Sequence, residues 1–139
     1  MDKKRYVGVA VICNNKLLLC KRNNQGSFPG MWSIPAGKLE ENEDTQDGAK
    51  REFFEETNID INEKNITFAG IVPRTTRDGK KVKGLMYVYR LASDVELEPD
   101  LENAKDGEEH SDWGYFSINE IKPENSGTYL HKLAEILLN

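Results

Sequence analysis

The sequence predicts an α+β fold made of two β-hairpins, a central helix and a C-terminal helix. Two observations carry this prediction: apolar runs twice flank tight-turn dipeptides, and two other stretches place apolar residues at helical spacing. The length of 139 residues suits one compact domain, residues 1–139, and a hydrophobic content of 37% is enough to bury its core.

The first hairpin is predicted from residues 5–13 and 16–22. Both runs are apolar, and the pair Asn14-Asn15 between them tolerates the positive φ that a tight turn needs. We therefore expect two antiparallel strands at the start of the chain.

The central helix is predicted for residues 45–57. Asp44 can cap its N-terminus, and apolar side chains recur at helical spacing along one face. Asn58 follows, a residue that can adopt the left-handed conformation in which helices end. Upstream, residues 23–36 are rich in glycine, proline and polar residues, so we expect a loop with at most a short strand at 32–34.

The second hairpin is predicted from residues 66–74 and 82–91, which flank the strong turn dipeptide Asp78-Gly79. Aromatic and apolar spacing near the end of the chain predicts two further elements. These are a strand at 113–116 and an amphipathic helix at 124–138.

Composition and charge limit the classes of function. A formal net charge of −5 provides no basic field for binding duplex nucleic acid, so a polyanionic substrate must meet local cations or a bound metal ion. We find no secretion signal and no apolar run long enough to cross a membrane, and we expect a cytoplasmic protein. Cys13 and Cys20 lack metal-ligand spacing and are expected to be buried, reduced thiols.

Three glutamates share one face of the central helix. Glu52, Glu55 and Glu56 stand at positions i, i+3 and i+4, and we expect this face to be exposed. Like charges at this spacing destabilise a helix by about 0.2–0.5 kcal/mol per pair, which a divalent cation would offset. Mg²⁺ prefers such hard oxygen ligands. An isolated acidic triplet is most often a solvated surface, so the surrounding pattern has to decide.

That pattern is GKLEENEDTQDGAKREFFEETNI, residues 37–59. It resembles the Nudix box: Gly, five residues, Glu, seven residues, Arg-Glu, a bulky apolar residue, any residue, Glu-Glu, any residue, Gly and a bulky apolar residue. The one departure is Asn58 in place of Gly, at a helix-ending turn that Asn tolerates at a small conformational cost. The resemblance extends to the strands before the box and to the acidic segment and aromatic strand after it, and so covers most of the chain.

The resemblance implies a Nudix α/β/α sandwich, with a mixed β-sheet between the box helix and the C-terminal helix. It also implies hydrolysis of a phosphoanhydride bond in a nucleoside diphosphate linked to a further group, with Mg²⁺ as cofactor and Mn²⁺ as a substitute. In this resemblance Arg51 orients the glutamates by ion pairing, and Glu43 supports a metal ion or its water. The implied metal ligands are Gly37 through its carbonyl, Glu52, Glu55 and Glu56.

The segment before the last strand supplies further candidates. Relatives carry a metal ligand or general base on such a loop, and Glu109 is the first choice for either role, with His110 second. A glutamate of the box is the alternative base. Because Asp106, Glu108 and Asp112 lie in the same polar stretch, an ordinary exposed acidic loop is the competing interpretation.

Substrate contacts are predicted from cations and aromatic residues near the box. Arg22 and Lys38 could reach phosphates, and Trp32 and Tyr115 could stack on a base, although aromatic residues more often belong to the core. The basic run at 74–83 suits a polyphosphate or an RNA 5′ end, or else a solvated turn.

The substrate stays open at this point among nucleoside triphosphates, ADP-ribose or another nucleotide sugar, dinucleoside polyphosphates and a 5′-triphosphorylated RNA. Two rival classes share this fold. A non-catalytic nucleotide sensor usually lacks some box glutamates, whereas all of them are present here. A diphosphate isomerase needs an active-site cysteine, whereas Cys13 and Cys20 lie in the predicted early strands. We expect a small nucleotide as partner, and a homodimer is common among relatives.

Overall fold

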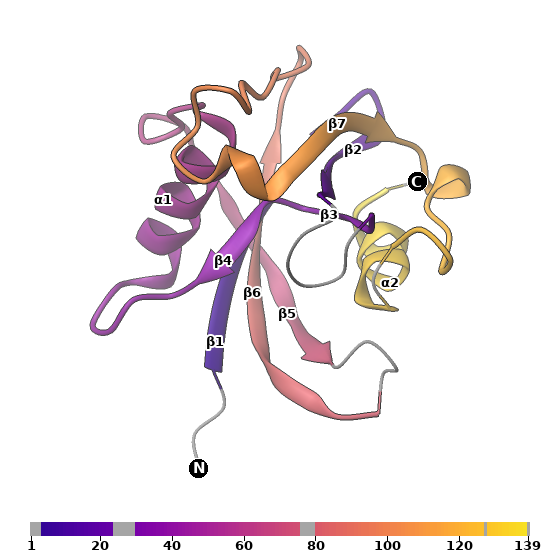
Figure 1. Ribbon diagram of the computed structural model, residues 1–139, viewed down its shortest axis with the longest axis horizontal. Coiled ribbons are helices and arrows are strands. Elements are labelled where there is room, and N and C mark those ends of the chain that lie inside the picture. The colour runs from indigo at the N-terminus through magenta and orange to yellow at the C-terminus, as the bar shows by residue number, and fades with distance from the viewer. Residues whose placement is uncertain (1–3, 24–29, 76–79, 127, 139) are drawn as a thin grey trace.

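The computed structural model describes residues 4–23, 30–75, 80–126 and 128–138. A mixed β-sheet lies between two helices, with α1 on one side and α2 on the other (Figure 1). The predicted α/β/α sandwich is therefore confirmed. The elements are β1 Lys4–Cys13, β2 Lys16–Arg22, β3 Trp32–Ser33, β4 Ala36–Lys38, α1 Thr45–Thr57, β5 Thr67–Thr75, β6 Val82–Ala92, η1 Gly107–Glu109, β7 His110–Phe116, η2 Ile118–Glu120 and α2 Thr128–Leu137.

Strand β1 is the centre of the sheet. It runs parallel to β6 and antiparallel to β2 and β4, in a sheet with the order β3-β2-β1-β6-β5. Its side chains alternate between the two faces: Val7, Val9 and Val11 pack toward α1, whereas Ala10 packs toward α2. Both faces of β1 are thus buried, as its nearly continuous apolar sequence requires.

Two hydrophobic cores hold the helices to the sheet. On the α1 side, Phe53 is fully buried against the valines of β1, and on the α2 side Leu130 and Leu133 pack against Met86 and Val88. The packing of α1 on the sheet fixes the place of Glu52, Glu55 and Glu56, which this helix carries.

The first hairpin is confirmed, with Asn14 at φ 52° and Asn15 at φ 59° in its turn. Its strands pair at only two positions, after which β2 pairs with β7 and β1 with β4. Cys13 and Cys20 are buried and free, as expected. The second hairpin is confirmed as β5 and β6, although its predicted Asp78-Gly79 turn lies outside the described residues.

The two helices differ in how well the local sequence predicts where they begin and end. Helix α1 has the predicted bounds; Asp44 caps it, and Asn58 ends it at φ 62° with its N–H donating to the Phe54 carbonyl. Helix α2 starts at Thr128 rather than at the predicted residue 124, because Ser126 forms a bridge to Trp32 of β3 instead of helix bonds. No helix in the described ranges is long and apolar enough to span a membrane.

Candidate active site

A cleft of about 690 Å³ lies beside β4 and α1. Carboxylates and cations share its lining, so the cleft has both a metal-attracting and an anion-attracting part. The lining residues are Lys4, Tyr6, Arg22, Ala36, Gly37, Lys38, Glu52, Glu56, Arg74, Lys83, Asp106 and Glu109.

Three carboxylates converge at one point of this site. Single oxygen atoms of Glu52, Glu55 and Asp106 lie within 4.8 Å of one another. The backbone N–H of Asp106 donates to the Glu55 carbonyl over 2.8 Å, which attaches the later segment to the C-terminal end of α1. Three hard oxygen donors at this spacing fit Mg²⁺ and do not suit a thiol-binding metal.

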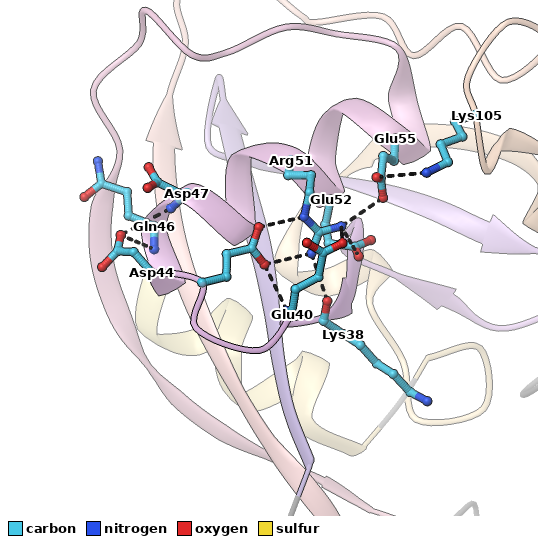
Figure 2. A network of polar contacts seen from close by, with 10 residues as sticks. Lys38, Glu40, Asp44, Gln46, Asp47, Arg51, Glu52, Glu55 and Lys105 are labelled. Carbon is cyan, nitrogen blue, oxygen red and sulfur yellow. Dashed lines mark hydrogen bonds and ion pairs between the residues drawn. The ribbon is translucent and has the colours of Figure 1, made fainter.

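Arg51 holds the carboxylates in place. Its guanidinium donates five hydrogen bonds, to both oxygens of Glu43, to Glu52, to Glu55 and to the Lys38 carbonyl, at 2.7–3.0 Å (Figure 2). These bonds use every N–H that an arginine has. The predicted contact between Arg51 and Glu55 is present, and Glu43 contacts Arg51 instead of extending toward the cleft.

The glutamate face of α1 is not exposed, contrary to the expectation from its charge. Glu52 has 8% of its surface accessible and Glu56 has 3%, because β4 and the segment at 106–109 cover the helix. Burial, with smaller contributions from neighbouring carboxylates, raises the pKa of both glutamates, and Arg51 opposes the rise for Glu52. Buried like charges of this kind are stabilised when a cation binds.

Glu56 has two specific neighbours. Its carboxylate accepts a hydrogen bond from the Ala36 N–H of β4 at 3.1 Å, and its Oε1 lies 3.8 Å from Nε2 of His110. Burial, together with the nearby Arg22, lowers the pKa of His110 to about 4, so the imidazole is neutral at neutral pH. The neutral imidazole of His110 therefore does not neutralise the charge of Glu56.

Gly37 leaves room for the carboxylate of Glu52. A β-carbon at this position would overlap that carboxylate, although the backbone of β4 would accept it. We expect Gly37→Ala to fold and to lose about 10-fold to 100-fold in metal affinity and turnover, the usual cost of displacing a ligand's support. Calorimetric titration with Mn²⁺ would measure this, with Gly114→Ala as control because its β-carbon has only one contact, at 3.4 Å. Wild-type affinity in Gly37→Ala would contradict this role.

The segment at 106–109 brings Glu109 to the cleft. Partial burial of its carboxyl group raises the pKa of Glu109, Arg22 opposes this, and the nearby acids add to it. Arg22 and Lys38 also line the cleft, and their contact with phosphates stays a prediction. The Lys38 side chain extends away from the Arg51 network, which contacts only its carbonyl (Figure 2).

The two predicted stacking residues lie in other surroundings. Trp32 packs on Phe116, with ring centroids 4.7 Å apart. The Tyr115 hydroxyl donates to the Leu97 carbonyl and accepts from its N–H, and its ring packs in the α1-side core. Tyr115 thus helps to position the segment that leads to Asp106.

Asp106 is the residue that sequence reasoning did not single out. It stands among several acids in a polar stretch, where the resemblance favoured Glu109. Its place beside Glu52 depends on a backbone bond to Glu55, some fifty residues earlier in the chain, and the sequence has no local signal for that bond.

Comparison with known proteins agrees with this geometry. The family model described as NUDIX domain matches residues 2–134. An 8-oxo-dGTP diphosphatase of Proteus vulgaris is 38% identical over 64 residues, 44% of this chain and 57% of that protein. The nucleoside triphosphatase NudI of Salmonella arizonae is 36% identical over 67 residues, 48% of this chain and 44% of that protein. The crystal structure of a MutT NUDIX hydrolase from Burkholderia pseudomallei superposes with a TM-score of 0.80 at 20% identity, covering 99% of each chain.

The fold and the carboxylate site thus define a Nudix domain. With the family model matching nearly the whole chain, this protein belongs to the Nudix family. Nudix enzymes generally use divalent metal ions, and the carboxylate cluster is present here. The alignments span 57% and 44% of the lengths of the two curated relatives, and the structural match at 20% identity shows the fold.

Proposed function

We propose that this protein is a Mg²⁺-dependent pyrophosphohydrolase, which cleaves a phosphoanhydride bond in a nucleoside diphosphate linked to a further group. The observation that carries the proposal is the convergence of Glu52, Glu55 and Asp106 beside a cleft that also presents cations. The activities named for the two curated relatives, a diphosphatase and a nucleoside triphosphatase, support nucleotides as the substrate class.

The carboxylates would hold the metal ions. Glu52, Glu55 and Asp106 would form the first ligand set, and Glu56 stands at the cleft as a further ligand, near the carbonyl of Gly37. When bound, Mg²⁺ supplies a more acidic water and neutralises charge on phosphate oxygens, and Mn²⁺ accepts the same ligands. Arg51 keeps Glu52 and Glu55 in the rotamers that the ion requires.

Glu109 is the carboxylate that we assign to accept the proton of the attacking water. It lines the cleft, and its raised pKa lets it bind a proton more readily than an ordinary glutamate does. His110 is the weaker base, since it is buried and has a pKa of about 4. Arg22 and Lys38 would bind phosphate oxygens and so orient the scissile bond.

A substrate panel tests the proposal. The protein is incubated with nucleoside triphosphates, ADP-ribose, a dinucleoside polyphosphate and a 5′-triphosphorylated RNA, each with Mg²⁺ and with EDTA. We expect hydrolysis only with the metal ion, and mass spectrometry in ¹⁸O-labelled water identifies the phosphorus atom that is attacked. Tight nucleotide binding without turnover of any substrate would instead indicate a sensor and overturn the proposal.

A further inference from the structure

The cleft contains cations that the proposed reaction does not use. Lys4 of β1, Arg74 of β5 and Lys83 of β6 line it together with the carboxylates. They come from three adjacent strands, since Gly84 of β6 pairs with both Lys4 and Arg74. The carboxylates come from α1 and from the segment at 106–109. The positively and the negatively charged side chains of the cleft therefore belong to different parts of the fold.

Arg74 is held by a stacking contact. Its guanidinium carbon lies 4.5 Å from the centroid of the Tyr6 ring. The ring can lie there because residue 84 is glycine: a β-carbon at Gly84 would come within 2.8 Å of the Tyr6 ring and would overlap the Lys4 carbonyl. The ring face attracts the cation, and the contact holds the guanidinium over the ring.

No carboxylate among the described residues neutralises the charge of Arg74. Over the ranges that the structure describes, no carboxylate forms an ion pair with Arg74, whereas four carboxylates pair with Arg51. A planar guanidinium that is fixed in a cleft and lacks a carboxylate partner is suited to the oxygens of a phosphate group.

We propose that Arg74, stacked on Tyr6, binds the terminal phosphate of a 5′-triphosphate and so selects triphosphates over nucleotide sugars. This inference rests on the proposed function, because it assumes that the metal ions hold the scissile phosphates. A triphosphate then has one more charged group to place along the cleft. The corresponding part of ADP-ribose is a neutral sugar, which would gain nothing from a guanidinium.

Binding of uncleavable ligands tests this selection independently of turnover. Affinities for the α,β-methylene analogues of a nucleoside triphosphate, of ADP-ribose and of a 5′-triphosphorylated oligonucleotide are measured by calorimetry with Mg²⁺. Arg74→Gln should weaken triphosphate binding about 10-fold to 100-fold, as expected for a lost hydrogen bond to a charged group, and should change ADP-ribose binding less than 2-fold. The tighter of the two triphosphates identifies whether a free nucleotide or an RNA end is the source.

Variants of the stack give the matched controls. Tyr6→Phe keeps the ring and should bind like wild type, whereas Tyr6→Leu should lose about 2-fold to 5-fold in triphosphate affinity. Arg90→Gln removes an exposed arginine from β6, outside the residues that line the cleft, and should have no effect. Thermal melts establish that each variant is folded.

Two results would overturn the inference: equal weakening of triphosphate and ADP-ribose binding in Arg74→Gln, or no weakening of either. These results leave the proposed hydrolase untouched if the wild-type protein turns over a nucleotide in the panel. Conversely, a protein that binds triphosphate through Arg74 but hydrolyses nothing would retain this inference and lose the proposed function. The two failures are thus distinguishable.

Discussion

Replacing Glu56 by glutamine should reduce turnover by about 100-fold to 1,000-fold, the range found when one preorganised group that stabilises developing charge is removed. Glutamine keeps the size of the side chain and can still accept from the Ala36 N–H, so the position of α1 against β4 is preserved. What is lost is a negative charge that faces the cleft beside Glu52. The measurement is the steady-state rate with saturating Mg²⁺.

The stability of the same variant separates a ligand role from a structural one. Glu56 is only 3% exposed, and burying a charged carboxylate costs free energy. We therefore expect Glu56→Gln to melt at or above the wild-type temperature without metal. Adding Mg²⁺ should raise its melting temperature less than it raises that of the wild type. Glu63→Gln, in an exposed turn, is the control and should match wild type. Undiminished turnover in Glu56→Gln would remove this residue from the site.

Replacing Arg51 by lysine should lower both stability and turnover, although it keeps the charge. An ammonium group has three donors and lacks the planar fork, so it cannot replace the five hydrogen bonds to Glu43, Glu52, Glu55 and the Lys38 carbonyl. Removing one partner of a buried ion pair lowers the free energy of unfolding by about 3–5 kcal/mol. We expect a loss of about 2 kcal/mol here, because 24% of the Arg51 side chain is exposed. Turnover should fall about 10-fold to 100-fold, as for other groups that orient metal ligands.

Urea unfolding curves and Mn²⁺ titrations measure the two effects separately. Arg90→Lys on β6 is exposed and supplies the matched control for the same chemical change. If Arg51→Lys bound Mn²⁺ as tightly as wild type, the guanidinium would serve stability alone. A loss of metal affinity in the folded variant would support its role in positioning Glu52 and Glu55.

Local patterns were sufficient for most elements of the fold. The bounds of α1 followed from Asp44, from the helical spacing and from Asn58, all of which act within the helix or at its ends. The start of α2 did not follow, because Trp32, almost a hundred residues earlier, donates its N–H to the Asn125 carbonyl and forms a β-bridge with Ser126. Strand β4 is three residues long and is formed by its pairing with β1, so its sequence alone has no strand signal.

The residues of the site also differ in whether the local sequence predicts their positions. Glu52, Glu55, Glu56 and Arg51 lie on one helix. Their relative positions follow from helical geometry, including the contact between Arg51 and Glu55. Their burial depends on segments that cover the helix from elsewhere, and so the exposed face expected from charge was wrong. The position of Asp106 depends on the same kind of long-range contact.

All five N–H groups of Arg51 donate to protein oxygens, and this affects the order in which ion and nucleotide would bind. Its guanidinium is enclosed by protein oxygens, so the cation nearest to the metal ligands cannot turn toward an incoming phosphate. A phosphate group beside Glu52, Glu55 and Asp106 without a metal ion would meet carboxylates that Arg51 alone does not balance, although the cations elsewhere in the cleft attract it. In the proposed reaction the metal ion would therefore enter before the nucleotide or be carried in with it.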